Sequence, residues 1–495
     1  MSTALPATDL PGRRSLRPLI GVLAAIAVSL TGTRVSVVAL PWFVLVTTGS
    51  ATQTGLVAFC EMTPYVLVKA FAGPLVDRIG PRAVSWTTDL VSASAAAAVP
   101  LCHVFDALSL PLLLVLVALI GAARGPGDLA KEVMVPEAAE RAAVPMERAT
   151  GFAGVTERLA STVGPAVGGG LVALIGPLPA LAVNAGCFAM GSLIIALLLP
   201  RGMGRAPEPA PADAAEAEPG YWRSFGAGFT FLKSDPLLLT VCVMVGITNF
   251  LDAAFSMVLL PVWAKESGHG PSVIGLVGSV QGVAAVLGSL LAALAASRLS
   301  RRVVFFVGFL LGGAPRFFAL ASDGPLLLVL PVFALAGFGA GFVNPVLGAV
   351  FYERVPRPML GRVRALSTSL AWAGIPLGGL AAGAAVASVG LLPALLTAGI
   401  TYFLTTSLPA LRPEWRAMDE RRAAAKAAGR APAPGTDDPG RDDPEPGGPE
   451  RDDPGHGGPE RGGPGQGGPE RGGPEPGEPE NPAADTAPDA PRALL

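Results

Sequence analysis

The chain has 495 residues, of which 51% are hydrophobic and 15% charged, and its mean hydropathy is +0.52. A soluble globular protein carries about 25% charged residues, so this composition argues against a cytosolic enzyme. Residues 412–495 hold 11 basic and 18 acidic side chains, a net charge of −7; because the whole chain is −2, residues 1–411 carry +5. The sequence therefore predicts a basic membrane body followed by an acidic tail.

Long apolar stretches run through the body of the chain. A helix needs about 20 mostly apolar residues to cross the hydrocarbon core of a bilayer. Twelve stretches approach this length, at about residues 19–46, 52–75, 83–103, 109–131, 151–176, 178–199, 237–263, 272–296, 302–321, 325–351, 363–389 and 391–410. They predict an all-α membrane protein with twelve transmembrane helices.

Basic residues mark alternate loops between these stretches. They precede the first stretch and follow the second, fourth, sixth, eighth and tenth: Arg13, Arg14, Arg17; Arg78, Arg82; Arg141, Arg148, Arg158; Arg201, Arg205, Arg223, Lys233; Arg298, Arg301, Arg302; Arg354, Arg357, Arg362 and Arg364. The other loops hold essentially only Lys265. The positive-inside rule then predicts that both termini are cytoplasmic. Abundant Arg and Ala with few Lys favour a bacterial inner (plasma) membrane.

The two halves of the chain repeat each other. With a shift of 220 residues Glu61 falls on Gln281, and with a shift of 216 Asp128 falls on Asn344. This repeat predicts two six-helix bundles in the same orientation, with a substrate cavity between them at the bilayer midplane. The expected boundaries are a first bundle over 1–200, a cytoplasmic linker over 201–236, a second bundle over 237–411 and a tail over 412–495.

The linker and the tail differ from the bundles in composition. Residues 201–220 are rich in Ala, Pro and Glu, which predicts a flexible segment, and residues 221–233 favour a short interfacial helix. In the tail, proline recurs every five residues from Pro439 to Pro479. Such a segment cannot offset the entropy of ordering, so it is predicted to be disordered and cytoplasmic.

The loop after the second stretch runs from Gly73 to Arg82 and reads GPLVDRIGPR. It resembles the signature loop of the major facilitator superfamily, with Pro81 at a position where that family usually has a basic residue. The resemblance implies a conformational latch between the halves on the cytoplasmic side. Its residues would be Gly73, Asp77, Arg78, Gly80 and Arg82. The second-half equivalent, Ser297 to Arg302, lacks the acidic residue, so the latch would be one-sided. The alternative is a basic turn without a switching role.

The fifth stretch contains Gly151, Ala160, Gly164-Pro165 and Gly168-Gly169. This pattern is similar to the antiporter signature of the same superfamily, and departs from it only at Ala160. The resemblance implies proton-coupled export rather than uptake, and the alternative is a helix whose small residues serve packing alone. The opening of the chain contains Leu40-Pro41-Trp42, Thr48-Gly49-Ser50, Glu61-x2-Pro64-Tyr65 and Pro136-Glu137. With these motifs it also resembles the macrolide-efflux and enterobactin-exporter branch, although Thr33 and Arg34 stand where that branch has an acidic residue.

Ionisable residues within the apolar stretches are costly and therefore suggest function. At 1.5 Å per residue, Glu61 lies about 14 Å into the second stretch, near the midplane. Arg34 reaches a similar depth in the first stretch, so the two are expected to pair, and protonation of Glu61 would free Arg34 or the substrate. Asp252 and Asp128 are the other proton-coupling candidates. Asp128, with Arg124, can equally be structural.

Polar and aromatic side chains of the apolar stretches are candidates to line the cavity. Arg316 has no evident partner in the sequence, and Lys69 is expected to extend toward the cytoplasmic interface. Asn344 can bind substrate or join helices through hydrogen bonds. The candidates for the substrate cavity are Arg34, Tyr65, Asn249, Gln281, Asn344 and Trp372.

The sequence contains no phosphate-binding loop, catalytic triad spacing or metal-ligand cluster, which argues against an enzyme, a bound cofactor or metal, and ATP-driven pumping. The favoured function is a secondary active transporter that exports a small amphiphilic molecule by proton antiport with alternating access. The alternatives are an uptake permease and a transport-inactive membrane scaffold that recruits partners through its tail. The expected partners are a small-molecule substrate, protons and the lipid bilayer but no nucleic acid, and the expected state is a monomer.

Overall fold

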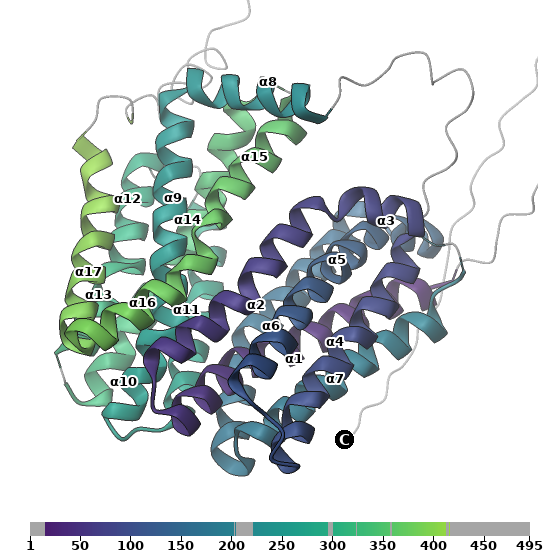
Figure 1. The fold of residues 1–495 in the computed structure, drawn as a ribbon. Coiled ribbons are helices and arrows are strands. Elements are labelled where there is room, and N and C mark those ends of the chain that lie inside the picture. Colours follow the sequence, from purple (N-terminus) through teal and green to yellow (C-terminus); the bar gives the residue numbers. More distant parts are fainter. Residues whose placement is uncertain are drawn as a thin grey trace, which may run out of the picture. The chain divides into compact units, whose positions relative to one another are not determined.

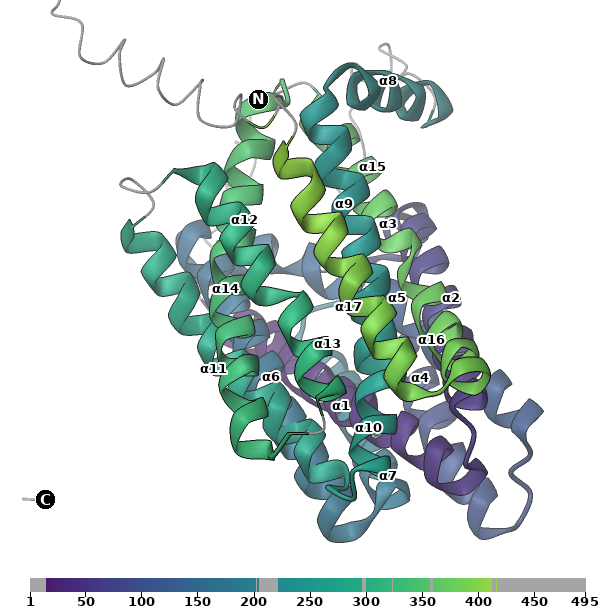
Figure 2. The same cartoon turned by 90° about the vertical axis from the view of Figure 1, so that its left-hand side faces the viewer.

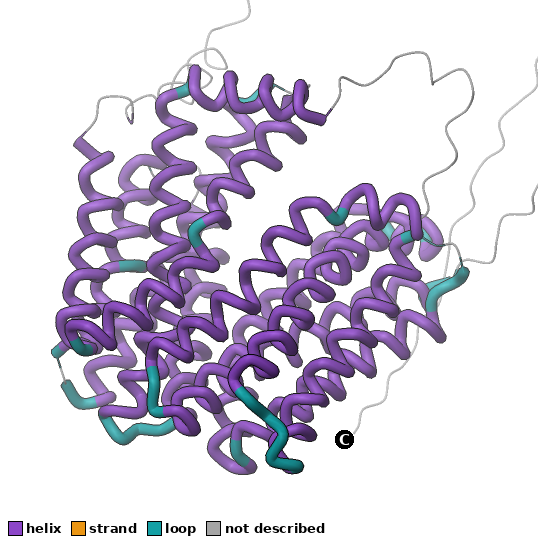
Figure 3. The backbone as a smooth tube through the Cα atoms, in the orientation of Figure 1, coloured by secondary structure: helices purple, strands orange, loops and turns teal. Residues whose placement is uncertain are grey.

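The structure, a computed structural model, describes residues 15–201, 203, 221–295, 300–322, 324–356, 359–411 and 415. Regular structure within these ranges is helical throughout (Figure 3). The predicted flexible segment over 201–220 lies outside the described residues except for Arg201 and Met203, and the predicted disordered tail lies outside them except for Trp415.

Ten helices of the described residues are long and apolar enough to cross a membrane. They correspond to α1 (Arg17–Thr48), α2 (Ala51–Phe71), α5 (Leu110–Ala142), α6 (Met146–Ile175), α7 (Pro177–Leu198), the run of α9 (Pro236–Ala254), the π-helix η2 (Phe255–Leu259) and α10 (Leu260–Glu266), α11 (Pro271–Ala295), the pair α12 (Arg301–Gly312) and α13 (Ala314–Ala321), α14 (Leu326–Arg354), and the pair α15 (Leu360–Ala373) and α16 (Ile375–Val389).

The remaining two predicted spans are also helices, α4 (Pro81–Val104) and α17 (Leu391–Ser407). α17 is apolar but has only 17 residues. α4 has 24 residues but carries Asp89 and several serines and threonines, which lower its hydropathy. All twelve predicted stretches are therefore helical, and the prediction of an all-α membrane protein is confirmed.

Helices of the same half pack mainly against one another (Figures 1 and 2). In the first half, α1 lies against α6 and α7, while α5 lies against α2 and α4. In the second half, α14 lies against α11 and α12, α16 against α9, and α17 against α13. The short helix α3 (Gly73–Ile79) follows α2, and α8 (Tyr221–Ser234) forms where the sequence predicts a helix and contacts α9 and α15.

The same close approach of two backbones occurs in both halves. A Cβ atom on Gly121 of α5 would overlap the carbonyl oxygen of Glu61 on α2, and one on Gly337 of α14 would overlap that of Gln281 on α11. Gly121 and Gly337 are equivalent in the sequence repeat, as are Glu61 and Gln281. The glycines therefore set the same helix pair in each half.

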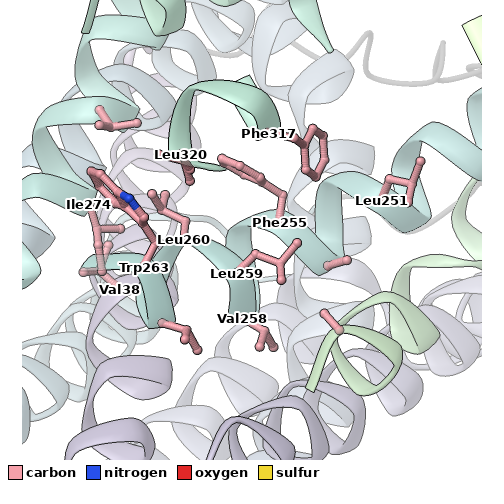
Figure 4. Packing of buried hydrophobic residues seen from close by; sticks show 14 of the residues in the cluster. Val38, Leu251, Phe255, Val258, Leu259, Leu260, Trp263, Ile274, Phe317 and Leu320 are labelled. Atoms are coloured by element: carbon pink, nitrogen blue, oxygen red, sulfur yellow. The ribbon is translucent and has the colours of Figure 1, made fainter. Parts of the chain in front are cut away.

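The two halves meet mainly along two helix pairs, α2 with α16 and α6 with α11, and α15 makes a smaller contact with α2. We call this whole contact surface the seam. A Cβ on Gly55 of α2 would overlap the carbonyl oxygen of Gly379 on α16, and Gly169 of α6 packs on Gly275 of α11. One apolar core cluster includes residues of both halves, among them Val38, Trp263 and Ile274 (Figure 4).

Candidate functional site

Helices α2 and α5 carry polar side chains spaced four residues apart. Residues at this spacing lie on one face of a helix, so those of α2 can meet those of α5. The glycines of α5 bring the two backbones together: Gly121 packs on Glu61, and Gly125 packs on the backbone of Tyr65 and Lys69. We call the resulting set the charged ladder, and its members are Glu61, Tyr65 and Lys69 of α2 and Arg124, Asp128 and Glu132 of α5.

Each level of the charged ladder joins the two helices. Arg124 Nη1 lies 3.0 Å from Glu61 Oε1, and Lys69 Nζ lies 3.1 Å from Glu132 Oε1. Between them, the Tyr65 hydroxyl donates to Asp128 Oδ2 at 3.3 Å, and Arg124 Nε is 3.9 Å from the same oxygen. Exposure rises along the ladder, from 13% for the Glu61 side chain to 63% for that of Glu132. The ladder thus runs from a nearly buried carboxylate to an exposed one.

The predicted pairing of Glu61 with Arg34 is wrong, because Glu61 is bound by Arg124. Arg34 Nη2 instead donates to Ser161 Oγ of α6 at 2.9 Å, and its Nε is buried without a hydrogen-bond partner among the described residues. Equal depth in the bilayer does not tell which way a side chain points. Arg34 points from α1 to α6, where Gly164 makes room for its stem.

Aromatic rings meet beside the ladder, across the seam. Tyr65 of α2 stacks on Trp372 of α15, with ring centroids 6.3 Å apart and planes inclined by 19°. Lys69 Nζ lies 5.8 Å from the centroid of Tyr65 and 5.5 Å from that of Trp372. Arg124 Cζ lies 4.4 Å from the Tyr65 centroid. The structure thus brings together two of the predicted cavity residues, one from each half.

The second half holds a separate ion pair. Asp252 of α9 pairs with Arg316 of α13, the partner that the sequence alone did not reveal. The Arg316 guanidinium also lies 4.8 Å from the ring centroid of Phe255 and 5.6 Å from that of Tyr402. The π-helix η2 begins three residues after Asp252, and such irregular turns are frequent at functional sites. Asp252 therefore stays a second candidate carboxylate.

The remaining cavity candidates lie apart from the ladder. Asn249 Nδ2 donates to the carbonyl of Ala371 at 2.9 Å, next to the break between α15 and α16 at Gly374. Gln281 is half-buried on α11, and Asn344 is exposed on α14. The Asn249 amide thus bonds to the residue before Trp372.

The predicted latch residues lie within α3 and directly after it. Asp77 and Arg78 are exposed. Gly80 has a φ of +95°, a backbone conformation that residues with a side chain rarely adopt. Arg82 donates to the carbonyls of Ala196 at 2.6 Å and Leu199 at 2.9 Å, at the end of α7. These bonds lie within the first half. The latch between the halves stays a prediction, and part of its second-half equivalent, Ser297 and Arg298, lies outside the described residues.

The small residues of α6 face two neighbours. Gly164 and Gly168 pack on Arg34 and Val35 of α1. On the seam, the carbonyl of Pro165 and the Cα of Gly169 contact Gly275 of α11. Gly151, at the other end of the pattern, has open space around its Cβ position. The glycine and proline pattern thus joins α6 both to the helix that carries Arg34 and to the opposite half.

One buried ion pair was not predicted from the sequence. Lys131 Nζ of α5 lies 2.7 Å from Asp89 Oδ1 of α4, with side-chain exposures of 3% and 1%. Ser29 Oγ of α1 donates to the other carboxylate oxygen at 3.4 Å. Both charges fall in predicted spans, so a list of every ionisable residue in those spans would have found them. Among the described residues, no group of His, Cys, Asp and Glu side chains could hold a metal ion.

A family model and two similar proteins all match most of this chain. Residues 22–251 and 242–437 match the model of the Major Facilitator Superfamily. The chain is 31% identical to the multidrug efflux pump Tap of Mycolicibacterium fortuitum over 407 residues, which are 81% of this chain and 97% of that protein. It is 32% identical to the multidrug efflux pump Tap of Mycobacterium tuberculosis strain H37Rv, over 80% of this chain and 94% of that protein.

A more distant relative and a solved structure agree with this match. The uncharacterized transporter y4rN of Sinorhizobium fredii is 25% identical over 79% of this chain and 95% of its own length. A crystal structure of the nucleoside transporter NupG has a TM-score of 0.63 and 15% identity, over 82% of this chain and 100% of that one. At this identity the likeness to NupG concerns the fold alone.

Proposed function

Because this chain belongs to the Major Facilitator Superfamily, we propose that it is a multidrug-type exporter that exchanges a small amphiphilic molecule for protons by alternating access. The names of the Tap relatives support export. The observation that carries proton coupling is the ion pair of Glu61 and Arg124, whose side chains are 13% and 8% exposed. A carboxylate within a membrane bundle is costly, so it is a functional candidate by default.

Protonation of Glu61 has a direct route to the opposite half. A neutral Glu61 no longer attracts Arg124, which then has Asp128, 3.9 Å away, as its remaining acidic neighbour. Arg124 also lies over Tyr65, and Tyr65 stacks on Trp372 of the second half. Protonation of Glu61 therefore changes the surroundings of the Tyr65–Trp372 contact, which joins the two halves. A proton can be coupled to a conformational change only if it interacts differently with the two conformations, and this contact provides such a difference.

Alternating access uses the two helix pairs of the seam. Glycines bring the backbones of these pairs together. Two side-chain hydrogen bonds between described residues cross the pairs, from Ser279 Oγ to the carbonyl of Thr162 at 3.0 Å and from Thr52 Oγ1 to the carbonyl of Gly383 at 3.3 Å. Few hydrogen bonds must therefore be released when these helix pairs separate. We propose Asp252 with Arg316 as the second titrating pair, and export rather than uptake on the strength of the α6 pattern. We further propose a monomer in the bacterial plasma membrane with both termini cytoplasmic.

The test is substrate-driven proton movement in proteoliposomes that contain the purified protein and a trapped pH-sensitive dye. Amphiphilic compounds are added to wild type, to Glu61→Gln and to Glu132→Gln, a matched control from the exposed end of the ladder. We expect Glu61→Gln to lower substrate-driven proton flux at least tenfold and to flatten its pH dependence, while Glu132→Gln stays near wild type. Wild-type proton flux and pH dependence in Glu61→Gln would overturn the coupling role of Glu61.

A second experiment tests the direction of substrate transport separately from the role of Glu61 in proton coupling. Everted membrane vesicles, energised to be acidic inside, are loaded from outside with the same compound, with and without a proton uncoupler. Export predicts accumulation in the vesicles that the uncoupler abolishes. Uncoupler-sensitive depletion from the vesicles instead would identify an uptake permease, and the absence of any movement across a panel of amphiphiles would favour the scaffold.

A further inference from the structure

The rings of Tyr65 and Trp372 form the only aromatic pair across the seam whose planes are nearly parallel among the described ring contacts. Tyr65 belongs to α2 of the first half and Trp372 to α15 of the second. The gap between these rings is therefore a distance that changes when the halves move relative to each other. Both side chains are half-buried, so neither is sealed in a core.

The spacing of the pair is close to that needed by a third ring. Stacked carbon atoms attract best at about 3.5–4.0 Å, so a flat ring between two others needs about 7 Å. The centroids of Tyr65 and Trp372 are 6.3 Å apart, and their planes differ by 19°. A small opening of the seam at this point would admit a flat conjugated ring, whereas a thick aliphatic cage would require a much larger one.

The second half, to which Trp372 belongs, holds the backbone around this residue in place. The Asn249 amide bonds to the carbonyl of Ala371, the preceding residue, at 2.9 Å. Gly374, two residues later, packs against Phe250 of α9. Since the chain is fixed on both sides of Trp372, the ring is positioned in advance and less entropy is lost when a ligand stacks on it. Asn249 acts here as a positioning residue.

Positive charges surround the ring pair. Lys69 Nζ lies within 6 Å of both ring centroids, and Arg124 Cζ lies 4.4 Å from that of Tyr65. These cations already lie over the electron-rich faces of the rings. A ligand cation at the same place would meet like charge, whereas an acidic substituent would meet the Lys69 ammonium. The three carboxylates nearby are already engaged: Glu61 is paired with Arg124, Asp128 accepts from the Tyr65 hydroxyl at 3.3 Å, and Glu132, which pairs with Lys69, is 63% exposed.

We propose that Tyr65 and Trp372 form a stacking subsite for a flat conjugated ring, and that Lys69 beside it selects an acidic substituent over a cationic one. The inference rests on the proposed function for the pathway that brings the ligand to the seam. It adds the chemical class of the substrate, which the proposed function leaves at an amphiphile.

Binding is tested on the full chain in lipid nanodiscs, with 1-pyrenecarboxylate and 1-pyrenemethylammonium as probes that share a flat ring and differ in charge. Energy transfer from tryptophan to pyrene reports binding, and displacement by excess unlabelled 1-naphthoate defines the saturable part. We expect the carboxylate to bind at least fivefold more tightly than the ammonium, and adamantane carboxylate, which is not flat, to compete at least tenfold more weakly than naphthoate.

Substitutions test which residues form the stacking subsite. Tyr65→Phe and Trp372→Phe keep a ring and are expected to bind within threefold of wild type, whereas Tyr65→Leu and Trp372→Leu lose about tenfold, which corresponds to about 1.4 kcal/mol. Lys69→Met should remove the preference for the carboxylate, and Asn249→Ala should weaken binding of both probes equally. Trp42→Leu, a tryptophan in α1 outside the ring pair, is the matched control and should bind as wild type does.

Two outcomes overturn the subsite: leucine variants that bind like their phenylalanine counterparts, and a preference for the ammonium probe in wild type. The assay uses no proton gradient, so its result is independent of coupling. If pyrene binding behaves as expected but Glu61→Gln leaves proton exchange intact, the coupling proposal fails and the subsite stands. If proton exchange depends on Glu61 but the leucine variants bind normally, only the subsite fails.

Discussion

The helix pair α2–α5 of the first half and its equivalent α11–α14 in the second share a backbone arrangement but not a chemistry. Gly121 packs on the carbonyl of Glu61 just as Gly337 packs on that of Gln281. Yet the levels of the charged ladder have uncharged equivalents in the second pair, which are Gln281, Ala285, Ser289, Ala340, Asn344 and Gly348. The glycines thus determine the architecture, and the ladder is an addition to it.

The same contrast holds behind the ladder. Asp89 and Lys131 form a buried ion pair in the first half, and the repeat places Phe309 and Leu347 at the equivalent positions of the second. Phe309 is buried in the main apolar cluster, and Leu347 packs against it. One fold therefore accepts either an ion pair or an apolar pair at this place. The residues at equivalent positions of the second half therefore indicate which substitutions the first half should tolerate.

The largest effect is expected from breaking the buried pair of Asp89 and Lys131. Lys131→Met leaves a carboxylate that is 1% exposed without its cation, and such a loss costs about 3–5 kcal/mol. The double variant Asp89→Leu with Lys131→Met imitates the apolar second half and should recover most of that loss. Thermal unfolding of the purified protein in detergent measures both. A double variant no more stable than the single one would show that the pair is needed for more than neutralising charge.

A somewhat smaller loss of stability, about 3 kcal/mol, is expected from Arg124→Ala, because Glu61 then lacks its cation but keeps partial access to water. Glu61→Gln with Arg124→Ala installs the uncharged pattern of Gln281 and Ala340 and should restore stability. It should not restore substrate-driven proton flux. Unfolding temperature and proton flux, measured on the same preparations, separate the two effects. Restored flux in the double variant would mean that coupling does not reside in the ladder.

Patterns along the sequence were sufficient for the fold but not for the contacts of the site. Apolar length predicted all twelve helices, because bilayer thickness constrains the length of a span directly. Glu61, Tyr65 and Trp372 were singled out as polar or aromatic residues within those spans, and their functional roles stay predictions. The partner of Glu61 could not be predicted in this way, because depth fixes the height of a side chain but not its direction around the helix.

The spacing of four residues in Glu61, Tyr65 and Lys69, matched by Arg124, Asp128 and Glu132, was a signal that could have corrected this error. Other contacts leave no such trace. Arg316 pairs with Asp252 across 64 residues of sequence, and Trp372 reaches Tyr65 from the opposite half. Contacts of this kind depend on how helices pack, which helix patterns alone do not specify.

Alanine at the two equivalent glycines tests whether the shared architecture is as symmetric as it looks. A Cβ at Gly121 or at Gly337 would overlap a backbone oxygen of the neighbouring helix, and overpacking of this kind costs about 1–3 kcal/mol. We expect Gly121→Ala and Gly337→Ala to lower the unfolding temperature by similar amounts, and Gly151→Ala, where the Cβ position is open, to leave it unchanged. A much larger loss for Gly121→Ala would mean that the charged ladder itself depends on the close approach.

The smallest effect is expected from the loss of a hydrogen bond that the second half donates to the first, without an equivalent bond in the other direction. Lys265 Nζ donates to the carbonyl of Leu45 at 2.8 Å, and the two residues are equivalent in the repeat. Leucine cannot return the bond, so only one such contact ties α10 to the end of α1, on the predicted extracellular side. The α1 helix has no basic residue of its own in its last turn, and Lys265 supplies a cation at the negative end of the helix dipole. The Leu45 carbonyl also accepts from the Gly49 N–H at 3.1 Å, so it keeps a partner when the lysine is removed.

Loss of this hydrogen bond in Lys265→Met should therefore favour separation of the halves on that side by about 1 kcal/mol, or roughly fivefold in population. Spin labels at Asp106 and Glu266, in a background without the four native cysteines, would report the change as a larger fraction of long distances. Leu45→Met, which keeps the carbonyl, is the control and should leave the distances unchanged. An unchanged distribution in Lys265→Met would mean that other contacts between the halves keep that side closed, such as the glycine contacts of the seam and the hydrogen bond from Thr52 Oγ1 to the carbonyl of Gly383 at 3.3 Å.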